Sequence, residues 1–322
     1  MEFRRVEEMD ASKEPIEMIL IYTMTLALSS STCFVTCFTV FKWATAKANA
    51  CHGTLFMVFL CLSFWFLTRL VYTFGVYLHG LTANLRVPVV LFSRVIADSL
   101  SIAASLWFTF SAYELQRWVF NPRSAEGSRQ TMLRYYRICF GLAALYMFPI
   151  GILCFVELEE ENQPNDNDLT QTLYYTSFII LAIRVISIVY PAGVTAALFI
   201  KGDDIRDNFG RALIDVHSYR SIRLVLAVFC ALNVPFLMVD NRLISLGSLD
   251  PSTAALVRSF FKILPYSSGA AVSFVMGYYL AGFDEFYKVN REPHLPKSPE
   301  SSYFHDPLAT ARLQPSFFVV SD

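Results

Sequence analysis

The sequence predicts an all-α integral membrane protein, a bundle of seven transmembrane helices. Hydrophobic residues make up 55% of the 322 residues and charged residues only 16%, whereas a typical soluble domain carries about 25% charged residues. Apolar runs long enough to cross roughly 30 Å of hydrocarbon occur seven times along the chain. These runs lack the alternation of period two that transmembrane β-strands show, which argues against a β-barrel.

The seven runs divide the chain into three parts. They cover Ile19–Phe41, Thr54–Leu78, Val87–Tyr113, Ile138–Val156, Thr172–Ile200, Ile222–Asp240 and Ala254–Ala281. Residues 1–18 then form an N-terminal segment, residues 19–282 the helix bundle and residues 283–322 a tail. Residues 283–291 are predicted to form a short amphipathic helix on the membrane surface, and the Pro- and Ser-rich remainder of the tail is predicted to be disordered.

Features before, between and within the runs support this division of the chain. The first run follows a segment whose acids outnumber its bases, so it is predicted to stay as a signal anchor and not to be cleaved. A strongly acidic connection, Glu157–Gln171, separates the fourth run from the fifth. The seventh run contains Pro265, which has no N–H and is predicted to kink the helix beside Lys262.

Basic residues in the connections predict the orientation. Fifteen Lys and Arg residues lie in the connections on one side of the membrane and five on the other. Because cytosolic connections carry the excess of Lys and Arg, the N-terminus is predicted to lie outside or in a lumen and the C-terminus in the cytosol. The connection Glu157–Gln171, with six acids and no base, is predicted to be non-cytosolic.

Several classes of function are disfavoured. The five histidines lie in connections, at the ends of runs or in the tail, so no intramembrane metal site is predicted. The chain has no glycine-rich phosphate loop and no nucleophile elbow, which favours a non-enzymatic protein without a cofactor. A net charge of −1 gives no reason to expect nucleic-acid binding.

Charged residues inside the runs predict a candidate ligand site. Arg94 and Asp98 lie four residues apart in the third run and are predicted either to pair with each other or to face a site in the bundle interior. Arg184 in the fifth run and Lys262 in the seventh are further candidates, and for Lys262 the alternative is a side chain that reaches the headgroups. A retinal Schiff base on Lys262 with Asp98 as counter-ion is disfavoured, because Arg258 stands where an acid would be expected.

Three stretches resemble the plant tobamovirus multiplication proteins and the related lysosomal orphan seven-transmembrane proteins of animals. The stretches are Arg69-Leu70-Val71, then Ser105-Leu106-Trp107 with Tyr113-Glu114-Leu115-Gln116-Arg117, and Ile263-Leu264-Pro265 with Ser267 and Ser268. The resemblance implies a receptor-like scaffold of an endolysosomal or vacuolar membrane that recruits cytosolic factors such as a small GTPase. The alternative is a G-protein-coupled chemoreceptor of the plasma membrane with an intramembrane ligand site.

The cytosolic connections supply a candidate partner surface. Glu114 and Arg117 lie three residues apart at the cytosolic end of the third run, where a solvated salt bridge is the simplest expectation. In residues 202–220, Phe209 and Leu213 belong to an apolar stripe of helical spacing. The stripe is predicted to contact either the lipid bilayer or a cytosolic partner, a G protein or a small GTPase.

Overall fold

The computed structural model describes residues 16–39, 50–78, 87–120, 125–159, 166–208, 216–240 and 251–287. Seven α-helices occupy these ranges. They are α2 (Ile16–Thr39), α4 (Ala50–Leu78), α5 (Pro88–Phe120), α6 (Ala125–Glu159), α7 (Asp166–Asn208), α8 (Val216–Asp240) and α9 (Pro251–Tyr287). The prediction of an all-helical bundle is confirmed, and each predicted run lies within one helix except for a few residues at the ends of some runs. Several helices extend beyond the apolar runs, most clearly α6, which begins more than three turns before Ile138.

Six of these helices are long and apolar enough to cross a membrane. The qualifying stretches are Met18–Thr39, Ala50–Leu78, Pro88–Arg117, Gly127–Val156, Tyr175–Ile200 and Ser221–Val239. Among the residues searched, α9 does not qualify, and its sequence shows why, since Arg258, Lys262 and several serines interrupt its apolar positions. The six helices support a multi-pass helical membrane protein. The seventh span, formed by α9, stays a prediction.

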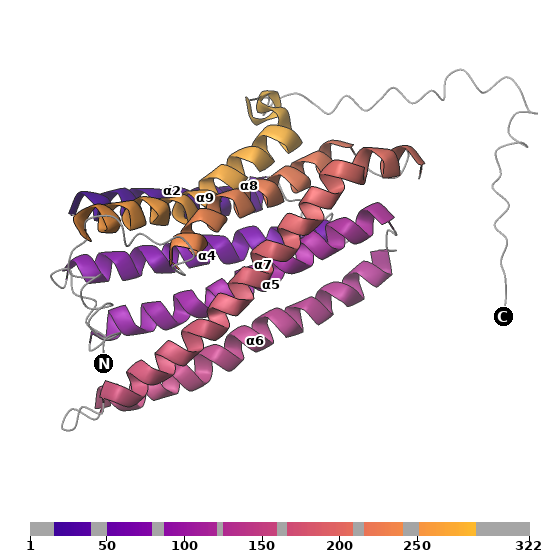
Figure 1. Ribbon diagram of the computed structural model, residues 1–322. Helices are drawn as coiled ribbons and strands as arrows, with labels where there is room; N and C mark the ends of the chain where they lie inside the picture. The colour runs from indigo at the N-terminus through magenta and orange to yellow at the C-terminus, as the bar shows by residue number, and fades with distance from the viewer. Residues whose placement is uncertain are drawn as a thin grey trace, which may run out of the picture. The chain divides into compact units, whose positions relative to one another are not determined.

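Successive helices run in opposite directions, so the bundle of residues 16–282 has two ends (Figure 1). We call the end at which α4 finishes and α5 begins the Leu78 end. The opposite end, at which α5 finishes and α6 begins, is the Arg117 end. Helix α5 packs on α4, α6, α7 and α8, and its contact with α4 is extensive.

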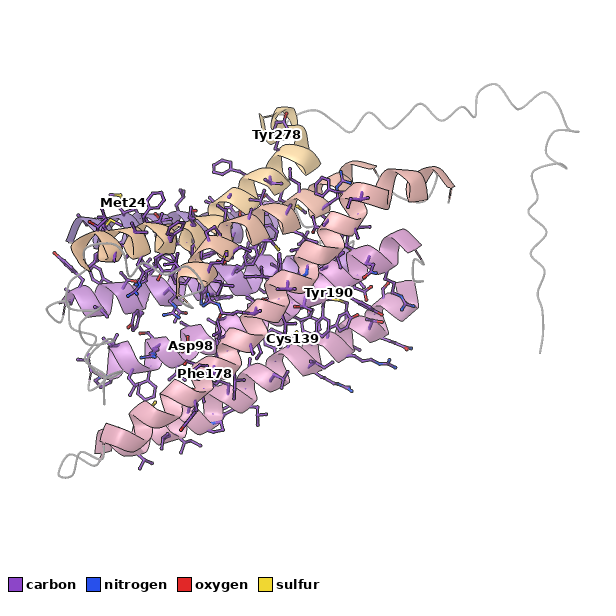
Figure 2. The ribbon with its side chains drawn as sticks, in the orientation of Figure 1. Met24, Asp98, Cys139, Phe178, Tyr190 and Tyr278 are labelled. Atoms are coloured by element: carbon purple, nitrogen blue, oxygen red, sulfur yellow. The ribbon has the colours of Figure 1, made fainter. Side chains whose placement is uncertain are left out.

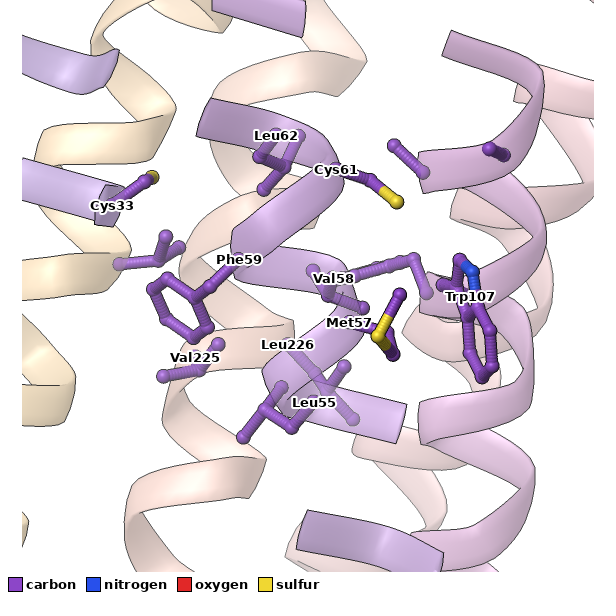
Figure 3. Close-up of a cluster of buried hydrophobic side chains, with 14 of the residues drawn as sticks. Cys33, Leu55, Met57, Val58, Phe59, Cys61, Leu62, Trp107, Val225 and Leu226 are labelled. Atoms are coloured by element: carbon purple, nitrogen blue, oxygen red, sulfur yellow. The ribbon is translucent and has the colours of Figure 1, made fainter. Parts of the chain in front are cut away.

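One large apolar cluster fills the bundle interior. Leu55 and Phe59 of α4 belong to it together with Val225 and Leu226 of α8 (Figure 3). Trp107 of α5 is fully buried in the same cluster, against the rings of Tyr136 and Phe140. Seven free cysteines are also buried in the bundle, and none of them forms a disulfide. The interior is therefore held by close packing of apolar side chains.

The outward surface of the helices is also apolar. Met24 of α2 is 72% exposed, Ile200 of α7 is 77% exposed and Phe178 of α7 is 51% exposed, and Figure 2 shows Met24 and Phe178 on the outside of their helices. Large exposed apolar surfaces are rare on soluble monomers. Together with the helical backbone, whose hydrogen bonds lie within each helix, this surface fits a hydrocarbon environment.

Helices α2 and α9 are joined by hydrogen bonds from side chains to backbone. The Tyr22 hydroxyl donates to the Ser259 carbonyl at 3.1 Å. The Ser29 hydroxyl donates to the Tyr266 carbonyl at 2.5 Å and accepts from the Ala270 N–H at 3.2 Å. Although α9 is separated from α2 by more than two hundred residues, these contacts place it directly against α2.

Candidate functional site

An ion pair between two helices lies inside the bundle. Arg69 of α4 donates from Nη2 to Asp98 Oδ1 of α5 at 3.1 Å, and their side chains are 22% and 15% exposed. The Tyr146 hydroxyl of α6 donates to the other oxygen of Asp98 at 3.5 Å. Asp98 thus joins three helices, and Figure 2 shows it between neighbouring ribbons.

The predicted pairing of Arg94 with Asp98 is wrong. Asp98 pairs instead with Arg69, which lies 29 residues earlier in the chain. The physical reason is that α4 and α5 pack extensively against each other, so Arg69 reaches Asp98 directly across the interface. Arg94 lies nearby and interacts electrostatically with the Tyr146 hydroxyl.

Aromatic rings and two cations form a second group beside the ion pair. Lys262 Nζ lies 5.3 Å from the centre of the Tyr22 ring, and the Tyr22 and Tyr266 rings meet edge to face at 5.5 Å. Trp65 lies 6.5 Å from Tyr266 between ring centres, and Arg184 Cζ lies 5.8 Å above the Trp65 ring. Such cation–π contacts become stronger when they are withdrawn from water.

The two groups form one structure, which we call the interior polar cluster. Helix α4 connects them, because Trp65 of the second group and Arg69 of the ion pair lie one turn apart on the same face of this helix. Each member occupies the half of its helix nearer the Leu78 end. The members are Tyr22, Trp65, Arg69, Asp98, Tyr146, Arg184, Lys262 and Tyr266.

Three of the four residues predicted for the ligand site belong to this cluster. Asp98, Arg184 and Lys262 come together although they lie on α5, α7 and α9. Arg69 was predicted only as part of a short motif, and no role was predicted for Trp65. A signal was present, since these two residues stand four apart on α4 and so share one helical face.

A second polar contact lies at the Arg117 end. Glu114 was predicted at an exposed helix end, but it is only 3% exposed. The Tyr135 hydroxyl of α6 donates to Glu114 Oε1 at 2.6 Å, and the Tyr190 hydroxyl of α7 donates to Gln116 Oε1 at 3.1 Å. The end of α5 is thus tied to both α6 and α7.

The remaining predicted partner residues have mixed outcomes. Arg117 lies one turn after Glu114 near the end of α5, with its Nε buried. Phe209 and Leu213 lie outside the described residues, between α7 and α8. In the part of the chain that the structure describes, no group of three His, Cys, Asp or Glu side chains is arranged to hold a metal ion.

Comparisons with known proteins add no assignment. No model of a known protein family matches the chain, and no curated protein matches it either. The chemistry of the site is therefore derived from its own residues. The interior polar cluster presents N–H and O–H donors together with aromatic faces, and such groups line many sites for polar small molecules.

Proposed function

We propose that this multi-pass membrane protein is a non-enzymatic, receptor-like protein that holds a ligand in the interior polar cluster. The observation that supports the proposal is the convergence of charged and aromatic residues from α2, α4, α5, α6, α7 and α9 at one level of an otherwise apolar bundle. Ionisable residues inside a membrane are expensive to bury, and they usually mark ligand or ion sites. Small-molecule sites also commonly lie between the helices of bundles.

The proposed topology has seven spans, with α9 as the seventh. In its support, α9 hydrogen-bonds to α2 at three successive levels, through Tyr22, Ser29 and Cys33. Lys262 lies over the Tyr22 ring of α2, so one of the charges that lower the hydropathy of α9 belongs to the cluster. The distribution of Lys and Arg supports an orientation in which the Leu78 end faces outside or a lumen and the Arg117 end faces the cytosol.

A second candidate function is a membrane scaffold that recruits a cytosolic G protein or small GTPase. The ties from α5 to α6 and α7 at the Arg117 end favour it, because they hold that end in one arrangement on which a partner can dock. The resemblance to tobamovirus multiplication proteins supports a vacuolar or endolysosomal membrane for such a scaffold. In this reading the Arg69–Asp98 pair only stabilises the fold.

Proximity labelling distinguishes the two functions. A labelling enzyme attached after Asp322 would report cytosolic neighbours for the wild type, for the double variant Arg69→Gln/Asp98→Asn, and for the double variant Phe209→Ser/Leu213→Ser. If the protein is receptor-like, we expect both double variants to change the neighbours. If it is a ligand-independent scaffold, we expect only the second to do so.

The controls keep the outcome interpretable. Arg94→Gln removes a charge from α5 one turn from Asp98 without touching the ion pair, so it should leave the neighbours unchanged. Each variant must also reach the same membrane as the wild type, which microscopy of the tagged protein shows. Identical neighbours in the wild type and both double variants would contradict both candidate functions.

A further inference from the structure

The outward surface of α6 changes from basic to apolar along the helix. Near its start, the exposed side chains include Arg129, Arg134 and Arg137. From residue 138 onward the large exposed side chains of this helix are apolar, and they are Ile138, Phe140, Leu142, Leu145, Phe148, Ile152, Phe155 and Val156. Arg134 and Ile138 lie one turn apart, so the basic part continues directly into the apolar part on one face. Helix α6 lies at the edge of the bundle (Figure 1), and this face is turned away from the other helices.

The change from basic to apolar marks the edge of the hydrocarbon. At 1.5 Å per residue, residues 138–156 are about 28 Å long, which matches the roughly 30 Å of hydrocarbon in a bilayer. A charged side chain is expensive to place within the hydrocarbon, so Arg137 lies at its edge. The polar headgroup layer beyond this edge is about 5–8 Å thick.

The three arginines lie at different heights above the hydrocarbon. Measured along the helix from Ile138, the backbone of Arg137 is about 2 Å outside, that of Arg134 about 6 Å and that of Arg129 about 14 Å. Side chains of a helix also lean toward its N-terminus, which for α6 is the end outside the hydrocarbon. Arg134 and Arg137 therefore reach the headgroup layer, whereas Arg129 extends beyond it.

The charge of these arginines favours an anionic partner. Residues 127–137 contain no acidic residue, and Glu126 is the one acid before them on α6. In the part of the chain that the structure describes, none of the three arginines forms an ion pair or a side-chain hydrogen bond. Arginine binds phosphate oxygens with two parallel hydrogen bonds, and basic residues at this depth attract anionic lipids.

We propose that Arg129, Arg134 and Arg137, which we call the α6 arginine surface, bind a phosphoinositide, an inositol lipid with further phosphates on its ring. The phosphodiester of the lipid lies at the level of Arg134 and Arg137. A ring phosphate, which projects further from the membrane, is bound by Arg129. An ordinary anionic lipid does not fit as well, because its headgroup carries no phosphate at the height of Arg129.

The proposal goes beyond the proposed function and does not depend on a ligand in the interior polar cluster. Under the proposed orientation the start of α6 lies at the cytosolic end of the bundle, so the lipid would belong to the cytosolic leaflet. The test below uses protein in detergent, in which both ends of the bundle are accessible. A wrong orientation would therefore not hide the α6 arginine surface.

The test measures lipids bound to the purified full-length chain by native mass spectrometry. The protein, in a neutral detergent, is titrated with phosphatidylinositol bisphosphate, phosphatidylinositol or phosphatidylserine, all with the same acyl chains. We expect the bisphosphate to bind roughly tenfold more tightly than phosphatidylinositol, which has the same ring and phosphodiester but no ring phosphate. Phosphatidylserine should bind about as weakly as phosphatidylinositol, because each carries one net negative charge.

Matched variants assign the binding to single arginines. Arg129→Gln should weaken binding of the bisphosphate roughly fivefold and leave phosphatidylinositol unchanged, whereas Arg137→Gln should weaken both lipids by a similar factor. Both side chains are exposed, so neither change should impair folding. Arg94→Gln removes the same charge near the Leu78 end and should leave both lipids unchanged.

Three results would overturn the proposal. One is equal affinity of the wild type for the bisphosphate and for phosphatidylinositol. Another is a preference for the bisphosphate that Arg129→Gln leaves intact, which would place the lipid elsewhere on the protein. The third is an equal loss of that preference in Arg129→Gln and Arg94→Gln, which would mean that only the total charge matters. None of these results bears on the interior polar cluster, so the proposed function would be unaffected.

Discussion

Replacing Gly269 with alanine should destabilise the bundle, because α9 meets two other helices at this residue. A Cβ at position 269 would overlap Phe66 Cε2 of α4 and lie 2.9 Å from both Phe66 Cζ and Ser29 Cβ of α2. Phe66 and Ser29 are both fully buried, so neither has free space into which to move. The Cys33 thiol also donates to the Gly269 carbonyl at 3.5 Å, which holds the backbone at this level.

The expected magnitude follows from two opposing terms. Overpacking a closely packed interior costs about 1–3 kcal/mol, while alanine is favoured over glycine within a helix by about 1 kcal/mol. Because the clash involves two buried neighbours, we take the upper part of the first range and expect a net loss of about 1–2 kcal/mol. This lowers the unfolding midpoint by roughly 2–8 °C.

The assay is thermal unfolding with Gly277→Ala as the matched control. Gly277 lies on the same helix, and a Cβ there would meet nothing within 4 Å. The control should therefore be stabilised by about 0.5–1 kcal/mol through helix propensity alone. Adding Phe66→Leu to Gly269→Ala removes the clashing ring atoms and should restore part of the loss. A Gly269→Ala protein as stable as the Gly277→Ala protein would refute the packing argument.

Three further predictions concern the polar contacts and the topology. Arg69→Gln or Asp98→Asn alone should lower the unfolding midpoint by an amount equivalent to about 3–5 kcal/mol, whereas the double change should recover part of it; equal losses in all three proteins would show that the two side chains are not coupled. Tyr135→Phe removes the hydroxyl that donates to the buried Glu114 carboxylate and should cost about 1–3 kcal/mol, and an unchanged midpoint would count against that bond. An epitope after Asp322 should be cleaved by protease added from the cytosolic side, and one inserted within residues 160–168 should be protected. If both epitopes are cleaved, or both are protected, they lie on the same side of the membrane, and seven spans with this orientation are ruled out.

Apolar runs alone predicted the helices, because a bilayer requires long stretches of internally hydrogen-bonded backbone and the run lengths reveal them. The cost of burying charge also drew attention to Asp98, Arg184 and Lys262, which the structure brings into contact with Arg69 or with aromatic rings. Both inferences need only local sequence. They depend on the solvent and not on which helix packs against which.

The partners of those residues could not be predicted in the same way. A helix that is apolar on every side has no marked polar face, so its sequence does not fix how it is rotated toward its neighbours. The pairing of Asp98 with Arg69 depends on that rotation and on the relative height of α4 and α5. Glu114 was misjudged for a related reason, since a residue near the end of an apolar run is buried when a neighbouring helix such as α6 extends past it.

The hydroxyl of Ser29 gives α9 a mechanical property. It contacts both the Ala270 N–H and the Tyr266 carbonyl, the donor and acceptor of one helical turn, which begins one residue after Pro265. If the hydrogen bond between the Ala270 N–H and the Tyr266 carbonyl lengthens, the Ser29 hydroxyl remains a partner for both groups. Opening this turn inside the bilayer therefore leaves neither group without a hydrogen bond. The free-energy cost of a bend at this turn is therefore lower than in a helix whose opened N–H and C=O groups would face only hydrocarbon.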